Sequence, residues 1–156
     1  MPEINTNSQQ SMEEACRALI KRIAVEEENK LDAMMEPQFF RCQWEDKTLA
    51  LSFLNRPWMH NPVGNMHGGI IASAFDITMG TLCSCLSDFS AMTPTVSMEI
   101  CYLRPIPEGT RLIVEAEVTH WGRTVIQLVA KSWLEGEPKR LTATASASYY
   151  VVSKKK

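Results

Sequence analysis

The sequence is organised around residues 61–87, which read N-P-V-G-N-M-H-G-G-I-I-A-S-A-F-D-I-T-M-G-T-L-C-S-C-L-S. Gly64, Gly68 and Gly69 give the first part of this stretch the freedom that tight backbone geometry requires. The following residues, 70–87, contain no proline, and Asp76 is their only charged residue. This pattern predicts one buried helix that carries a single carboxylate.

The predicted helix has two different sides when successive residues are placed about 100° apart. The bulkier residues share one side and can cover a sheet: Ile71, Phe75, Thr78, Leu82 and Leu86, with Met79 at the margin. A second stripe is made almost entirely of small residues: Gly69, Ala72, Ser73, Asp76, Gly80, Cys83 and Ser87. Small side chains let a ligand or another backbone come close. Asp76 is therefore either an ordinary core carboxylate with hydrogen-bond partners or a functional group facing that gap.

Composition narrows the class of protein. A chain of 156 residues with 45% hydrophobic and 22% charged residues is expected to form one globular domain with a sizeable core. A net charge of -2 gives no electrostatic reason to expect nucleic acid as a partner. The sequence has no uninterrupted apolar run of membrane-spanning length and no signal-peptide pattern at its start, so we expect a soluble, cytoplasmic protein with no membrane partner.

The cysteines and histidines do not suggest a metal or a cofactor. Five cysteines without a C-x-x-C pair are typical of reduced thiols that fill core space: Cys16, Cys42, Cys83, Cys85 and Cys101. A nucleophilic Cys83 beside His67 is the alternative, and packing is the favoured interpretation. The three histidines, His60, His67 and His120, lack metal-ligand spacing.

The N-terminal region is expected to form a tail and one helix, residues 1–36. Residues 1–10 have no clear pattern and are expected to be loosely held. The sequence S-M-E-E at Ser11 is typical of a capping box and predicts a helix through about Met35, which Pro37 ends. Residues 153–156 form a basic tail.

The remaining residues, 37–152, predict an α+β domain. Apolar residues alternate with other residues, or run nearly continuously, in six segments: 40–44, 49–53, 95–102, 111–118, 125–134 and 141–151. In the third segment the alternate apolar positions are Val96, Met98, Ile100 and Tyr102. Successive strands joined by short turns are expected to pair antiparallel, and the apolar helix would lie across the concave face of the curled sheet.

This order of elements and the motif from Asn61 to Asp76 resemble the hotdog fold, and more narrowly the PaaI-like acyl-CoA thioesterases. In that family H-G-G opens the central helix, a carboxylate follows nine residues after the histidine and an asparagine precedes it by six. His67-Gly68-Gly69, Asp76 and Asn61 match all three positions. The resemblance implies a curled antiparallel sheet of five to six strands around one central helix, with an extra N-terminal helix. It also implies a site between two subunits of a homodimer or of a homotetramer arranged as a dimer of dimers.

Thioester hydrolysis requires donors that stabilise negative charge on the carbonyl oxygen, and a free amide at a helix N-terminus is such a donor. Gly68 or Gly69 would supply it. Asn61 either adds a second donor, helps to hold the water or merely forms an Asx turn before Pro62. His67 either orients the thioester sulfur or caps the helix.

Asp76 would act as general base on water or as a nucleophile that forms an anhydride. The family places a Ser or Thr that holds the water at the start of the next strand, which corresponds to Thr95, or to Ser97 if the register differs by two. Each hydroxyl could equally be an ordinary strand residue.

For coenzyme A, which is part of the substrate, the resemblance implies the turn Gly122-Arg123-Thr124, because a guanidinium can bind phosphate with two hydrogen bonds. The acyl group is left open by the sequence. Its candidate pocket residues are equally good core residues: Trp58, Met59, Phe75, Met79 and Met92.

Two other functions fit the resemblance less well. A hotdog hydratase or dehydratase would place its histidine and acid differently. A non-catalytic acyl-CoA-binding protein would leave Asp76 without an evident purpose, and the DNA-binding domain that usually accompanies such sensors is missing from the sequence.

Overall fold

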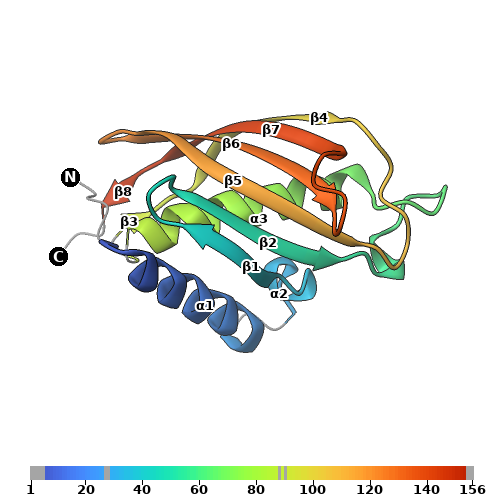
Figure 1. Cartoon of the computed structure of the whole chain (residues 1–156), viewed down its shortest axis with the longest axis horizontal. Coiled ribbons are helices and arrows are strands. Elements are labelled where there is room, and N and C mark those ends of the chain that lie inside the picture. Colours follow the sequence, from blue (N-terminus) through green and yellow to red (C-terminus); the bar gives the residue numbers. More distant parts are fainter. Residues whose placement is uncertain (1–5, 27–28, 88, 90, 154–156) are drawn as a thin grey trace.

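The computed structural model describes residues 6–26, 29–87, 89 and 91–153. Its main helices are α1 (Gln9–Glu26), α2 (Leu31–Met34) and α3 (Gly68–Leu86), with a 3-10 turn at Pro57–Met59. Six strands form one antiparallel sheet: β1 (Gln38–Gln43), β2 (Thr48–Leu54), β4 (Thr95–Tyr102), β5 (Arg111–Trp121), β6 (Val125–Leu134) and β7 (Leu141–Tyr150). The short strands β3 (Ala91–Met92) and β8 (Val152–Ser153) pair separately (Figure 1).

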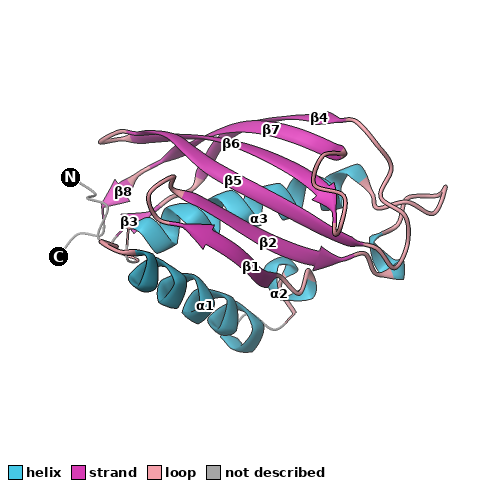
Figure 2. Cartoon of the chain, viewed as in Figure 1, coloured by secondary structure: helices cyan, strands magenta, loops and turns pink. Residues whose placement is uncertain are grey.

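The sheet curves around α3, as Figure 2 shows, and the central helix is confirmed. Its predicted bulky side is buried throughout, from Ile71 at 5% exposure to Leu86 at 0%. The helix is long and apolar enough to cross a membrane, but 61% of that span is buried inside the protein. Its apolar character is therefore that of a core helix that a sheet covers.

Strand order departs from the simple pairing of successive strands. The sheet runs β1-β2-β5-β6-β7-β4, so β4 pairs with β7 and lies at one edge, while β5 pairs with β2 and β6. The short connection 103–110 therefore crosses the end of the sheet instead of closing a hairpin. Its sequence, L-R-P-I-P-E-G-T, contains two prolines, and Ile106 within it is fully buried.

One extra residue changes which side chains of β4 face α3. Thr95 pairs with Tyr149 and Ser97 pairs with Ser148, so Val96 forms a bulge between them. The predicted alternation holds from Met98 onward, whereas Val96 is 61% exposed. Because a bulge shifts the side-chain alternation by one, Thr95 and Ser97 lie on opposite faces of the sheet.

The N-terminal region differs from the prediction of one helix from Ser11 to about Met35. The first helix begins at Gln9, with the Ser8 hydroxyl accepting the Ser11 amide, so the predicted capping box at Ser11 is wrong. A separate short helix, α2, follows, and between the two Asn29 has a φ of 70° that a regular helix cannot contain.

Side-chain contacts fix the start of α1 against the sheet. The Gln9 amide donates to the Cys42 carbonyl at 2.9 Å and accepts from the Trp44 backbone at 2.9 Å. Met12 and Cys16 of α1 are fully buried in the same core as α3. Thus α1 is an integral layer of the fold, and the part of 1–10 that the structure describes is tied to β1.

Candidate active site

Asp76 lies near the middle of α3, partly exposed, with its carboxylate directed toward β4 and β7. The Thr95 hydroxyl donates to Asp76 Oδ1 at 2.6 Å. The Tyr149 hydroxyl donates to the same oxygen at 2.7 Å and lies 3.2 Å from the Asp76 carbonyl oxygen. Two hydroxyls therefore hold one carboxylate oxygen, and Thr95, which was predicted to hold the water, lies in contact with Asp76.

Tyr149 lies in the segment 141–151 that the sequence predicts as a strand, and the sequence did not identify it as a site residue. Its side chain is 1% exposed, yet its hydroxyl reaches a carboxylate. Burial and the neighbouring Asp76 raise the pKa of Tyr149 above its ordinary value, so the phenol remains protonated and remains a donor. A tyrosine among alanines on an otherwise small-residue face was the available signal.

A groove of about 290 Å³ opens beside Asp76. Thr95 and Tyr149 line it together with Ile77 and Gly80 of α3. On its other side are residues from α1 and α2, which makes the N-terminal region part of the wall: Leu19, Arg22, Ile23 and Asp32. Asp76 is thus accessible to a small molecule although its partner Tyr149 is buried.

The start of α3 is held by its own side chains. His67 Nδ1 accepts the Gly69 amide at 2.9 Å, so His67 is the N-cap and the Gly69 amide is already occupied. The Gly68 amide has no acceptor among the described residues. The Tyr102 hydroxyl donates to the Gly68 carbonyl at 3.0 Å and fixes this peptide from the β4 side. Of the two glycines, Gly68 is the one with an unused donor.

Asn61 forms the turn that leads into the helix. Its Oδ1 accepts the amides of Val63 and Asn65, each at 3.1 Å, which is an Asx turn, and Gly64 within it has a φ of 83°. The turn does not use the Asn61 side-chain NH₂. Asn61 and Gly68 line a second hollow, of about 370 Å³, which shares no residue with the groove beside Asp76.

The two predicted halves of the site are well separated within one chain. Gly68 and Asp76 are eight residues apart on α3, which places them about 12 Å apart along the helix axis. The atoms of one thioester carbonyl cannot contact both residues of the same chain. The structure therefore brings Asp76 together with Thr95 and Tyr149, and Gly68 together with Asn61 and His67.

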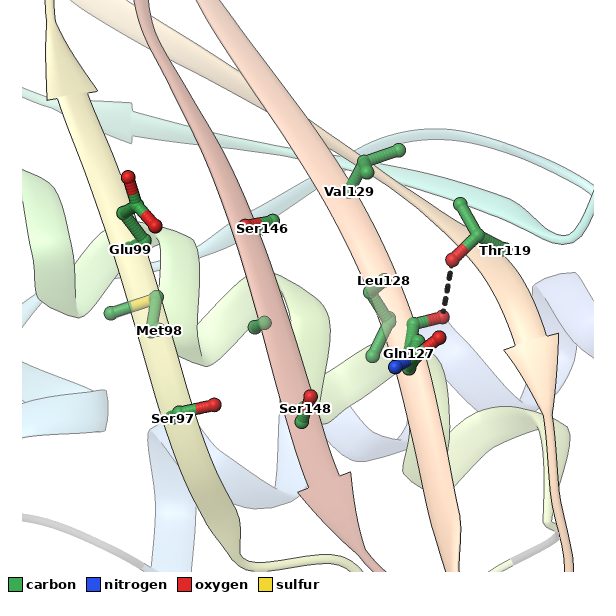
Figure 3. A pocket seen from close by; sticks show the side chains of 10 residues that line it. Ser97, Met98, Glu99, Thr119, Gln127, Leu128, Val129, Ser146 and Ser148 are labelled. Atoms are coloured by element: carbon green, nitrogen blue, oxygen red, sulfur yellow. Dashed lines mark hydrogen bonds between the residues drawn. The ribbon is translucent and has the colours of Figure 1, made fainter.

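Ser97 lies on the outer face of the sheet, away from Asp76, because of the bulge at Val96. It lines a hollow of about 390 Å³ with Ser146, Ser148 and Gln127 of the neighbouring strands (Figure 3). Ser97 as a substitute for Thr95 is therefore wrong for this chain.

The turn Gly122-Arg123-Thr124 joins β5 to β6 at the end of the sheet where Thr95 lies. Trp121, Ile126, Tyr149 and Thr95 follow one another across four strands. A Cβ on Gly122 would lie 2.6 Å from the Val125 carbonyl oxygen, so the turn requires glycine there. Arg123 and Thr124 are exposed.

Cys83 is unsuited to nucleophilic chemistry. Its side chain is fully buried, and burial raises the pKa of its thiol to about 12, which disfavours the reactive thiolate.

None of the five predicted acyl-pocket residues lines the groove beside Asp76. Among them Met59, Phe75 and Met79 are core residues, each 1% exposed or less.

A curled antiparallel sheet around one central helix, with a carboxylate on that helix beside a groove, defines a hotdog-fold protein. Residues 63–140, half of the chain, match the thioesterase superfamily. A curated relative, the medium/long-chain acyl-CoA thioesterase YigI of Escherichia coli (strain K12), is 31% identical over 70% of this chain and 78% of its own length. The chain belongs to the thioesterase superfamily.

Solved structures give the same fold. The E. coli PaaI protein from the phenylacetic acid degradation operon superposes with a TM-score of 0.76 at 14% identity, covering 94% of this chain and 97% of its own. Zebrafish thioesterase superfamily member 2 gives 0.77 at 15% identity, covering 94% and 100%. A Streptococcus mutans protein bound to acetyl CoA gives 0.66 at 22% identity, covering 77% and 91%. The predicted resemblance to PaaI-like hotdog thioesterases is confirmed.

Proposed function

We propose that this protein hydrolyses acyl-CoA thioesters to a free acid and coenzyme A. The observation that carries the proposal is the Asp76 carboxylate, held at one oxygen by Thr95 and Tyr149 beside an open groove. Membership of the thioesterase superfamily and the activity in the name of the relative YigI support it.

In the proposed reaction Asp76 removes a proton from water while the water oxygen bonds to the thioester carbon. The carbonyl electrons move to oxygen, and the Gly68 amide stabilises that oxyanion, with the Asn61 NH₂ as a second donor. When the carbonyl reforms, the C–S bond breaks and coenzyme A leaves as a thiolate. Direct attack by Asp76, with hydrolysis of the resulting anhydride, uses the same groups.

The separation of the two halves supports a site shared between two copies of the chain. About 12 Å along α3 prevents one thioester from contacting Gly68 and Asp76 of the same chain. In a two-fold symmetric dimer, Asp76 of one copy faces Gly68 of the other, and the pairing occurs twice. A homodimer is therefore the minimal active unit, and a dimer of dimers is compatible with it.

Arg123 is proposed to bind a phosphate of coenzyme A from the turn between β5 and β6. The guanidinium is exposed, and the turn lies at the end of the sheet that carries Thr95. Gly122 and Thr124 shape that turn, since the Gly122 amide donates to the Val125 carbonyl and the Thr124 carbonyl accepts from Val151.

Release of free thiol from a panel of acyl-CoAs tests the function. The panel spans acetyl to palmitoyl and includes phenylacetyl, and substrates are ranked by kcat/KM. Turnover of saturated acyl-CoAs is expected, with medium and long chains preferred. Hydration of an enoyl-CoA without thiol release would show a hydratase, and tight acyl-CoA binding without turnover would show a binding protein.

A further inference from the structure

Thr95 and Tyr149 form a pair because the sheet places them directly opposite each other. They are cross-strand partners of β4 and β7, and both side chains face α3. Both hydroxyls donate to Asp76 Oδ1, at 2.6 and 2.7 Å. Within the described part of the chain, no group donates a hydrogen bond to Asp76 Oδ2. Oδ1 is therefore held by two hydrogen bonds, and Oδ2 remains available to a molecule in the groove.

This arrangement limits rotation of the carboxylate. The terminal torsion of an aspartate is intrinsically broad, so an unheld carboxylate would present either oxygen. Two charge-assisted hydrogen bonds to one atom favour a single orientation. The bulge at Val96 is required for this arrangement, because without it Thr95 would point to the outer face of the sheet.

Tyr149 is a rigid member of this pair. Its ring is buried, and a Cβ on Gly80 would lie 3.8 Å from it, so α3 passes close above the ring at a residue without a side chain. Thr95, by contrast, is exposed. The buried phenol therefore fixes the position of Oδ1 more firmly than the exposed hydroxyl does.

We infer that Tyr149 is a positioning residue that, with Thr95, fixes Asp76 Oδ1 and presents Oδ2 as the reacting atom. This inference rests on the proposed function, because it assigns the atom of Asp76 that takes the proton from water or attacks the thioester. In this inference Tyr149 acts through Asp76 and neither takes nor gives a proton in the reaction.

The test compares Tyr149→Phe with Tyr150→Phe. Both variants remove one hydroxyl from a tyrosine of β7. Of these two tyrosines, only Tyr149 bonds Asp76, whereas Tyr150 is 47% exposed. Phenylalanine keeps the ring of Tyr149, so the fold should be retained. We expect kcat on the best acyl-CoA to fall about tenfold or more in Tyr149→Phe, since misplacing a reacting group lowers the rate, with KM unchanged within about twofold. Tyr150→Phe should match wild type.

Thr95 supplies a second, independent variant series. Thr95→Val should lower kcat without raising KM, and Thr95→Ser, which keeps the hydroxyl, should restore it. Thermal unfolding midpoints of all variants should stay close to wild type, which separates positioning from a structural role.

Three results would overturn the inference. They are a Tyr149→Phe kcat equal to that of Tyr150→Phe, a rise in KM alone, or a loss that follows a lowered unfolding midpoint while Thr95→Val is fully active. If wild type is active and Asp76→Asn is not, any of these results contradicts only the positioning of Asp76. A wild-type protein that hydrolyses no acyl-CoA would remove the proposed function and this inference together.

Discussion

At the start of α3 the turn that carries the unbonded Gly68 amide is formed mainly by residues close in sequence, with the Tyr102 hydroxyl of β4 donating to the Gly68 carbonyl, whereas Asp76, about two turns further along, is held by β4 and β7. The first region is a backbone donor, fixed by the His67 cap and the Asn61 turn. The second is a side chain whose orientation depends on the register of a distant strand pair. The comparison separates what each half needs: correct local turns for the donor, and a correctly assembled sheet for the carboxylate.

The largest effect is expected when the carboxylate loses its ability to accept a proton. Asp76→Asn is nearly isosteric, and its side-chain oxygen can still accept the Thr95 and Tyr149 hydroxyls, so the fold should be unchanged. Loss of general-base catalysis should lower kcat by ~10²- to 10⁴-fold. Steady-state thiol release, with circular dichroism as the folding control, measures this. A kcat near wild type would remove Asp76 from the chemistry.

The next largest effect tests the backbone donor itself. Gly68→Pro deletes the amide hydrogen at the first helical position, where proline is well tolerated, and His67 already has the extended ψ of 140° that precedes proline. Losing one oxyanion donor should lower kcat by ~10²- to 10³-fold.

Gly68→Ala is the matched control for Gly68→Pro, because it adds a Cβ and keeps the amide. That Cβ would meet the Tyr102 ring at an ordinary 3.5 Å, so little distortion is expected. Gly68→Pro should lower kcat much more than Gly68→Ala does. Equal kcat values for the two variants would show that the amide is not the donor.

A smaller effect is expected at Arg123, which acts on binding in this account and not on either half of the site. Arg123→Gln should raise KM for acyl-CoA by about three- to tenfold, with kcat retained, because an exposed phosphate contact is lost. The same acyl group on pantetheine lacks the nucleotide phosphates and should show no change. An equal rise in KM for both substrates would contradict phosphate binding.

The difference between the two halves also explains what the sequence could predict. The motif from Asn61 to Asp76 is local, so its turn, helix start and buried helix side follow from glycine positions and from helical periodicity. The choice between Gly68 and Gly69 did not follow, because it depends on which amide the His67 ring accepts.

Long-range pairing limited the rest of the prediction. Strict alternation along residues 95–102 gave no sign of the bulge at Val96, so Ser97 remained a candidate beside Thr95 until the register was known. Tyr149 lies in the predicted strand segment 141–151, but its partner Asp76 is 73 residues away in sequence, so no local pattern indicated their contact. The break between α1 and α2 was missed because residues 11–36 contain no proline or glycine, and only the structure shows the positive φ of Asn29.

The most direct test of the account is complementation between two inactive chains. Asp76→Asn and Gly68→Pro chains carrying different affinity tags are coexpressed, and the heterodimers are purified through both tags in sequence. If each site takes Asp76 from one copy and Gly68 from the other, every heterodimer contains one site with both defects and one with neither. The account predicts about half of the wild-type kcat per heterodimer, while both homodimers stay inactive. Purified heterodimers no more active than the parent variants, or a fully active monomer by light scattering under assay conditions, would contradict it.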